Sequence, residues 1–147
     1  MFEKTLVAGW GDMDWNSHMA NTAYFNKGAD VRMMFFAEHG FPTEAFARLR
    51  VGPVVMKDEI EYRREVGLLQ PIRVSLALAG LAADGSRFVL RNVIARADGH
   101  ACATITSAGG WLDLVQRKLV APPAELLAAL GALERTEDFE ELPSGLR

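Results

Sequence analysis

The feature that most constrains the fold of this chain is a proline-free segment, Ala23–His39, that is apolar on nearly every side. Asn21 or Thr22 can cap its start as a helix, and Gly40 and Pro42 end it. The apolar side chains that cover most of the helix circumference are Tyr24, Phe25, Ala29, Val31, Met33, Met34, Phe35 and Phe36. A helix with so little polar surface is predicted to be buried nearly all round. The rest of the chain must therefore supply a layer that wraps around it.

Beyond this helix the sequence changes to the two-residue period of β-strands. A short helical turn is expected over residues 43–50, after which Val54–Arg63 alternates between apolar and polar side chains. Asp-Gly turns then join further strands, which we expect at residues 72–78, 87–97 and 100–115. Gly109 and Gly110 in the last strand indicate a bulge or a close approach of two backbones.

The two ends of the chain complete the predicted fold. A short strand is expected over residues 5–10, a second helix over residues 122–133, and an acidic tail from about residue 134. We therefore predict an α+β protein with a single domain, residues 1–147, in which an antiparallel sheet wraps around the long helix. Such a sheet leaves a wide face and an edge uncovered, so we expect the chain to associate with a second copy of itself.

Composition excludes several classes of function. Hydrophobic residues make up 50% of the chain and charged residues 24%, which is not the composition of a disordered chain. The formal net charge of -3 gives no general attraction to nucleic acid or to an anionic membrane, and we expect neither as a partner. No segment is long and apolar enough to cross a bilayer. The single cysteine, Cys102, permits no intrachain disulfide, so we expect a cytoplasmic protein with an inert core thiol.

The polar residues that can carry chemistry are concentrated just before the long helix. Asp12, Asp14 and His18 lie within ten residues of its start. The first N–H groups of a helix have no partner within the helix and carry partial positive charge, so they can hold an anion or a developing oxyanion. A carboxylate beside such a helix end is half of an acyl-transfer centre.

Three other interpretations of this loop compete with catalysis. A calcium-binding loop would need glycine at Ser17 and glutamate at Ala23, and we discard it. A transition-metal site is disfavoured because neither His39 nor His100 lies in a motif, so we expect no metal and no other cofactor. The third is structural, in which the polar side chains only cap the loop and the helix.

The segment from Asp12 to Tyr24 resembles the signature of the 4-hydroxybenzoyl-CoA thioesterase-like branch of the hotdog-fold superfamily, Asp-x-Asp-x-x-Gly-His-Val-Asn-Asn-x-x-Tyr. The likeness continues at Arg32, in an Ala-x-x-Arg step of the helix, and at Tyr62, in an Ile-x-Tyr strand end. By the order of elements it covers about residues 4–125. It departs from the signature at Ser17, where Gly permits a positive φ, and at Ala20, where the family has Asn.

The resemblance implies a hotdog domain that forms homodimers, sometimes homotetramers, through its sheets, and that hydrolyses an acyl-CoA thioester. Carried over by position, it assigns the catalytic carboxylate to Asp14, as nucleophile or general base, and the carbonyl-polarising N–H to Asn21. His18 matches a histidine that only some family members have.

Further residues are expected to bind the substrate. Trp15, Tyr24 and Gly28 would line an acyl groove beside the helix, and Arg63 and Arg64 would meet the phosphates of CoA.

Two alternatives keep the same fold. One is a non-catalytic module that binds acyl-CoA or an acyl carrier. The other is an enoyl-CoA hydratase, whose family signature places Asp and His five apart. Here Asp14 and His18 are four apart, and Asp12 and His18 are six apart, so the spacing favours the thioesterase.

One cation lies inside the apolar helix. Arg32 is flanked by apolar residues, and a buried charge requires a partner, for which Asp58 is the first candidate and Asp14 or Asp12 the alternatives. Asp58 itself interrupts the apolar face of its strand, which indicates a register break or an exposed edge.

Overall fold

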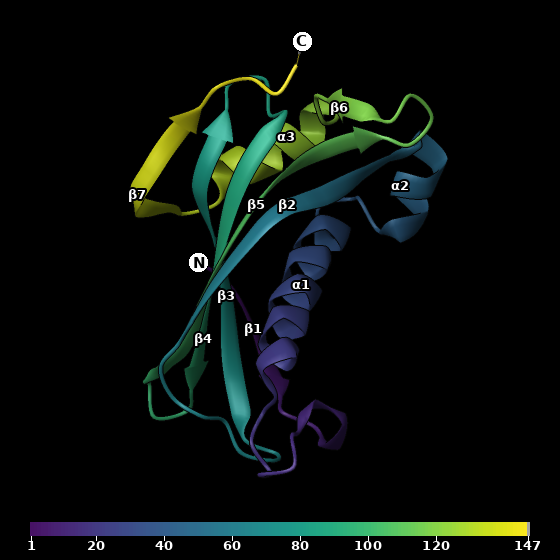
Figure 1. The fold of residues 1–147 in the computed structure, drawn as a ribbon. Coiled ribbons are helices and arrows are strands. Elements are labelled where there is room, and N and C mark those ends of the chain that lie inside the picture. The colour runs from purple at the N-terminus through teal and green to yellow at the C-terminus, as the bar shows by residue number, and fades with distance from the viewer. Residues whose placement is uncertain (147) are drawn as a thin grey trace.

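The computed structural model describes residues 1–146, which form a seven-stranded sheet and three α-helices (Figure 1). In chain order the elements are β1 (Phe2–Val7), α1 (Asn21–Glu38), α2 (Thr43–Leu49), β2 (Val51–Tyr62), β3 (Pro71–Ala82), β4 (Arg87–Arg96), β5 (Ala101–Asp113), β6 (Lys118–Val120), α3 (Ala124–Ala132) and β7 (Arg135–Leu142). None of the helices in this part of the chain is long and apolar enough to span a membrane.

The sheet follows the order β1-β3-β4-β5-β2, and each of these neighbouring pairs is antiparallel. β6 pairs with the end of β5, and β7 pairs in parallel with β3. β2 is therefore an edge strand, and its register shifts between Val55 and Lys57, as the position of Asp58 suggested. The predicted close approach is also confirmed, since a side chain at Gly109 would collide with the backbone of Val54.

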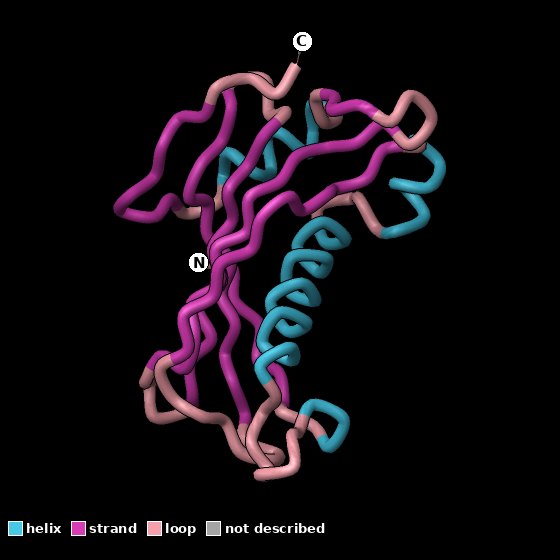
Figure 2. Tube along the Cα trace, in the orientation of Figure 1, coloured by secondary structure: helices cyan, strands magenta, loops and turns pink. Residues whose placement is uncertain are grey.

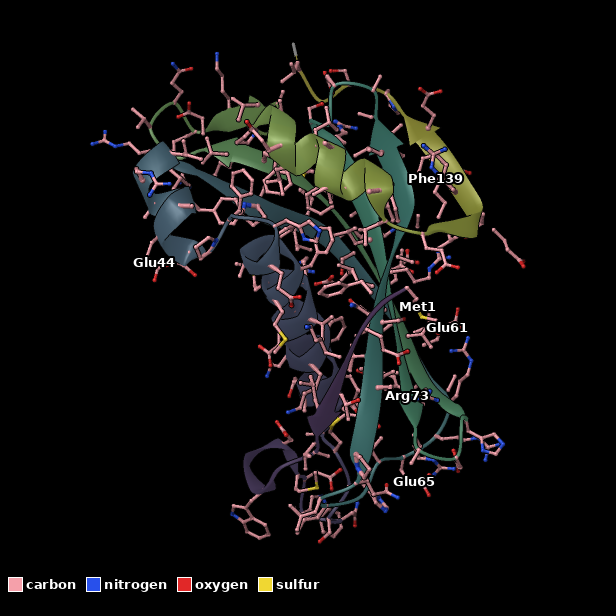
Figure 3. All side chains as sticks on the ribbon, turned by 180° about the vertical axis from the view of Figure 1, so that it is seen from behind. Met1, Glu44, Glu61, Glu65, Arg73 and Phe139 are labelled. Carbon is pink, nitrogen blue, oxygen red and sulfur yellow. The ribbon has the colours of Figure 1, made fainter. Side chains whose placement is uncertain are left out.

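The sheet twists strongly, and the ends of β2 and β5 bend over the C-terminal end of α1 (Figures 1 and 2). Glu61 and Arg73 lie on the side of the sheet away from α1 (Figure 3). The apolar residues of the strands point the other way and form one cluster with α1 and α3. An antiparallel sheet around a long helix is the α+β architecture that the sequence predicted.

Burial of α1 differs from the prediction. Its fully buried residues, Ala23, Tyr24, Gly28, Val31, Phe35 and Phe36, face the sheet. Phe25, Met33 and Met34 are only half-buried, because nothing in the described chain covers the outer side of the helix. The prediction of burial nearly all round was wrong for the single chain.

Three boundaries also differ from the prediction. The first strand ends at Val7, and Trp10–Asp12 forms a 3-10 turn instead. Neither Asn21 nor Thr22 caps α1, because the N-cap position is Ala20. Much of the expected acidic tail is β7, which lies beside β3.

The C-terminal end of α1 lies in an aromatic cluster. The indole ring of Trp111 lies 5.5 Å from the ring of Phe36, 6.0 Å from that of Phe46 and 5.4 Å from that of Phe88. Trp111 is completely buried. Aromatic side chains bury more apolar area than other residues and contribute strongly to stability, so this cluster anchors one end of the molecule.

Candidate active site

Two loops meet at the N-terminal end of α1, one between β1 and α1 and one between β2 and β3 (Figure 2). The backbone N–H of Met19 donates to the carbonyl of Val66 at 2.8 Å, and that of Leu69 donates to the carbonyl of Ala8 at 2.7 Å. These bonds join segments 47 and 61 residues apart in the sequence. They hold the loop that precedes α1 against the far end of β2.

The carboxylate of Asp14 organises a tight turn in the first of these loops. Its Oδ1 accepts hydrogen bonds from the backbone N–H groups of Asn16, at 2.8 Å, and of His18, at 3.2 Å. Ser17 has a φ of 62°, so it adopts the left-handed conformation for which the family signature uses glycine. Ser17 therefore adopts the backbone conformation that glycine would permit, and the Asp14 side chain is exposed.

The N-terminus of α1 has free donors next to this turn. No side chain caps the helix, and within residues 1–146 no hydrogen bond uses the N–H of Asn21 or of Thr22. The Tyr62 hydroxyl donates to the carbonyl oxygen of Asn21 at 2.9 Å, which ties the first turn of α1 to β2. Burial raises the pKa of Tyr62, so the phenol remains protonated and can donate at neutral pH.

These groups surround a cleft of about 300 Å³. Its lining includes six residues that the sequence proposed for the site: Asp14, His18, Asn21, Tyr24, Arg63 and Arg64. It also includes Met19, Tyr62 and Glu65, which sequence reasoning did not assign to the site. The cleft lies between α1, β2 and the loop after β2, and Glu65 is labelled at this end of the molecule in Figure 3.

Two residues proposed for substrate binding lie outside this cleft. Trp15 is 92% exposed and is not among the residues that line it. Gly28 faces the sheet, where a Cβ atom would lie 2.9 Å from Asn92 Oδ1 and 3.0 Å from the side chain of Ile105. Gly28 thus allows α1 to approach the sheet closely, and it does not border an open groove at this position.

Asp12 fixes the loop to α1 from the other side. Its carboxylate lies 2.9 Å from the ammonium of Lys27 and accepts a 2.8 Å hydrogen bond from the N–H of Gly9. Burial raises the pKa of Asp12, but the hydrogen bonds from Lys27 and Gly9 outweigh it, so the pKa is lower than usual. Asp12 therefore holds the loop in place, whereas Asp14 faces the cleft.

The predicted ion pair of Arg32 and Asp58 is not formed. Arg32 takes part in none of the ion pairs or side-chain hydrogen bonds within residues 1–146. Burial lowers the pKa of Arg32, and Asp58 is nevertheless the carboxylate whose negative charge opposes this shift. The carboxylate of Asp58 instead accepts a 2.5 Å hydrogen bond from the hydroxyl of Ser107, its partner across the β2–β5 ladder. Both Arg32 and Asp58 line a second, smaller hollow of about 110 Å³.

Two other features are weaker candidates for an active site. A hollow of about 590 Å³ lies near β6 and the end of the described chain, but its lining residues include no carboxylate, hydroxyl or imidazole: Arg87, Lys118, Leu119, Val120, Ala121, Gly145 and Leu146. Cys102 is buried, and burial raises the pKa of its thiol, which disfavours the reactive thiolate. The cleft at the start of α1 is therefore the candidate active site.

Comparisons with known proteins identify a family match and similar folds. The family model of the thioesterase-like superfamily matches residues 8–130. A protein from Staphylococcus aureus, solved in complex with CoA, has a TM-score of 0.82 and 21% identity, over 88% of this chain and 81% of that one. No curated protein sequence matches the chain.

Two further solved structures are named as CoA thioesterases. A 1,4-dihydroxy-2-naphthoyl-CoA thioesterase from Synechocystis has a TM-score of 0.81 and 13% identity, over 90% of this chain and 96% of that one. A gentisyl-coenzyme A thioesterase has a TM-score of 0.77 and 15% identity, over 87% and 98%. At such identities the likeness establishes the fold, which is the hotdog fold that the sequence motif implied.

Proposed function

The chain belongs to the thioesterase-like superfamily, and this membership makes it a thioester hydrolase; we propose that its substrate is an acyl-CoA, which it cleaves to the free acid and coenzyme A. One observation carries this proposal. The exposed carboxylate of Asp14 and the unused N–H groups at the start of α1 line a single cleft.

In the proposed reaction the thioester carbonyl oxygen binds at the N–H of Asn21. The partial positive charge of the helix end stabilises the negative charge that develops on this oxygen. Asp14 then acts in one of two ways. As a nucleophile it attacks the carbonyl carbon, the C–S bond breaks, CoA leaves as its thiol, and water hydrolyses the resulting anhydride. As a general base it removes a proton from water, which makes the attack directly.

Arg63 and Arg64 are proposed to bind the phosphates of CoA. Arg63 is already oriented, since its guanidinium donates to the Thr104 hydroxyl at 2.6 Å and to the Glu61 carboxylate at 3.1 Å. Both arginines line the cleft where β2 ends, so a polar CoA moiety would extend from the thioester toward solvent. The S. aureus protein of similar fold was solved in complex with CoA, which supports CoA as part of the substrate.

We further propose that the enzyme is a homodimer or a tetramer built from such dimers. β2 is a twelve-residue edge strand, and Val55 and Met56 on it are 39% and 56% exposed. A long edge strand with exposed apolar residues readily pairs with another strand, and a second copy would also cover the outer side of α1. Light scattering at micromolar concentration tests this, and a monomer that hydrolyses acyl-CoA would contradict it.

The test of the function is a panel of acyl-CoA substrates assayed with a thiol reagent. Release of free thiol that depends on the enzyme is the expected result. Enoyl-CoA substrates belong in the panel, because hydration without thiol release would identify a hydratase instead. Binding of acyl-CoA without turnover of any substrate would identify a binding module and reject the proposed function.

A further inference from the structure

The hollow of about 590 Å³ near β6, from here on called the β6 groove, lies at the opposite end of the molecule from the candidate active site (Figure 1). Its volume falls within the range of roughly 300–1,000 Å³ that is typical of small-molecule sites. No residue lines both the β6 groove and the cleft at the start of α1. The groove is therefore a separate position at which a ligand could bind.

Three segments form the walls of the β6 groove. Along β5, the first residue of β4 lies opposite Gly110 and the last residue of β6 lies opposite Trp111, so these two strands meet end to end beside β5. Arg87 lines the groove from β4, and residues 118–121 line it from β6 and the position that follows. The third wall belongs to residues 143–146, the segment after β7.

Hydrogen bonds hold this third wall in place. The backbone N–H of Gly145 donates to the hydroxyl of Ser86 at 2.7 Å, and Ser86 is completely buried. The Ser86 hydroxyl donates to the carboxylate of Asp84 at 2.6 Å, and the hydroxyl of Ser144 donates to the same carboxylate. A Cβ atom at Gly145 would lie 3.1 Å from the side chain of Arg87, so glycine lets the segment lie close to that side chain. The groove is therefore built into the packed fold.

The β6 groove has two positive charges that no ion pair neutralises. Arg87 and Lys118 are exposed, and neither takes part in an ion pair formed among residues 1–146. The neighbouring carboxylates accept hydrogen bonds from other groups. Asp84 accepts from the serine hydroxyls, and Asp113, opposite Lys118 in the ladder, accepts from two backbone N–H groups. In a protein whose net charge is -3, this groove is a local site of attraction for an anion.

The rest of the lining is apolar and consists of Leu119, Val120, Ala121, Gly145 and Leu146. An inorganic phosphate would leave these apolar side chains exposed to water. The pantetheine arm of CoA has several amide and hydroxyl groups, and the two cations are the only lining side chains that could bond to them. A ligand that uses both parts of the lining has one small acidic group and an apolar chain.

We propose that the β6 groove binds a medium-chain fatty acid, with its carboxylate at Arg87 and Lys118 and its chain along Leu119 and Val120. A guanidinium can hold a carboxylate through two parallel hydrogen bonds, and an ammonium adds a second positive charge. The inference does not depend on the proposed function, although a fatty acid is one kind of product that acyl-CoA hydrolysis would release.

The experiment titrates the protein with decanoate and follows methyl signals by NMR. Leu119, Val120 and Leu146 report on the groove, and Met19 reports on the cleft at the start of α1. Acetate, which has only the acidic group, and decanol, which has only the chain, are the matched probes. Decanoate should shift the groove signals and bind about tenfold more tightly than either, the scale of a hydrogen bond to a charged group. Equal affinity for acetate or for decanol would overturn the inference, as would shifts confined to Met19.

Variants then test the two cations. Arg87→Gln and Lys118→Gln should each weaken decanoate binding about tenfold. Neither substitution removes an ion pair within the described chain, so both variants should fold normally. Arg73→Gln is the matched control, because Arg73 is also exposed and lies on the side of the sheet away from α1, but does not line the groove (Figure 3). Unchanged affinity in both groove variants, or an equal loss in Arg73→Gln, would reject the inference. Because only binding is measured, the result is independent of whether the protein hydrolyses a thioester.

Discussion

The two ends of α1 differ in how their residues are packed. At the C-terminal end, Phe36 is fully buried and contacts the rings of Phe46 and Trp111. At the N-terminal end, Asn21 is exposed, Asp14 faces an open cleft, and backbone hydrogen bonds join the two surrounding loops.

The C-terminal end of α1 therefore contributes mainly to stability, and the N-terminal end contributes the groups proposed for catalysis. Aromatic packing fills the C-terminal end, whereas the N-terminal end presents free N–H donors and a carboxylate to an open cleft, although Met19, Tyr24 and Val66 near it are buried. Substitutions at the two ends should therefore have distinct effects. Those in the aromatic cluster should lower the free energy of unfolding, and those at the loop end should lower turnover.

The largest effect is expected in the aromatic cluster. Trp111→Ala should lower the free energy of unfolding by about 3–5 kcal/mol, because a large buried side chain is lost and a cavity remains. Trp15→Ala is the matched control at the other end, and since Trp15 is 92% exposed it should leave that free energy unchanged. Urea unfolding measures both, and equal losses from the two substitutions would contradict the comparison.

The next effect is on turnover. Asp14→Asn should lower kcat about a hundredfold or more, because the carboxylate proposed for catalysis is lost while the amide oxygen can still accept the turn hydrogen bonds. The control is Asp113→Asn, since Asp113 organises a similar turn by accepting from the N–H groups of Val115 and Gln116. Thiol-release assays and urea unfolding should show loss of activity without loss of stability for Asp14→Asn only. Near-normal hydrolysis by that variant would remove Asp14 from the mechanism.

A smaller effect on kcat is expected where α1 and β2 meet. Tyr62→Phe removes the hydrogen bond to the carbonyl of Asn21 and should lower kcat several-fold, since a net hydrogen bond is worth about 0.5–1.5 kcal/mol. Tyr24→Phe serves for comparison, because its hydroxyl makes a longer bond of 3.4 Å to the Arg64 carbonyl, so its loss should lower kcat less than the loss of the Tyr62 hydroxyl. If both variants kept full kcat, the position of the first turn of α1 would not depend on Tyr62.

The smallest effect is on stability and depends on pH. It concerns the ion pair that attaches the loop between β1 and α1 to the helix. The pKa of Asp12 is lower in the folded protein than its usual 3.8, so the Asp12–Lys27 pair stabilises the fold above that pH. This contribution should be lost as the pH falls through the folded-state pKa. Asp12→Asn should therefore lower stability near neutral pH and reduce the decline of stability below pH 3.8. Unfolding curves measured across this range would contradict the assignment if the two proteins declined in parallel.

Local patterns explain most of the correct predictions. Asp14, His18 and Asn21 lie within eight residues, so a single turn and the start of one helix bring them together. Arg63 and Arg64 were expected at the site for their charge, whereas no spacing in the sequence indicated that Tyr62 and Glu65, more than forty residues from Asn21, approach the helix start. Only the docking of β2 beside α1 brings them to it. The Ile-x-Tyr pattern at the end of β2 was the available signal for Tyr62.

The acidic residues after Glu134 show the opposite error. Glu140 and Glu141 suggested a solvated tail, yet this segment forms β7 beside β3. Gly80 allows the two strands to approach closely, since a Cβ there would lie 3.2 Å from the carbonyl oxygen of Glu140. A strand held by its backbone can have charged side chains on its exposed face, so its charge pattern did not reveal it.

The sequence by itself determined the order of elements, the apolar helix, and the motif that places a carboxylate before a helix N-terminus. These features depend on hydrophobic periodicity and on hydrogen bonds between residues that are close in the sequence, so the local sequence determines them. Only the tertiary structure decided which side of α1 is buried, that Asp58 bonds to Ser107 instead of Arg32, and that Tyr62 reaches the first turn of α1. These features depend on strand register and on the distance between α1 and β2, which are set by packing between residues far apart in the chain.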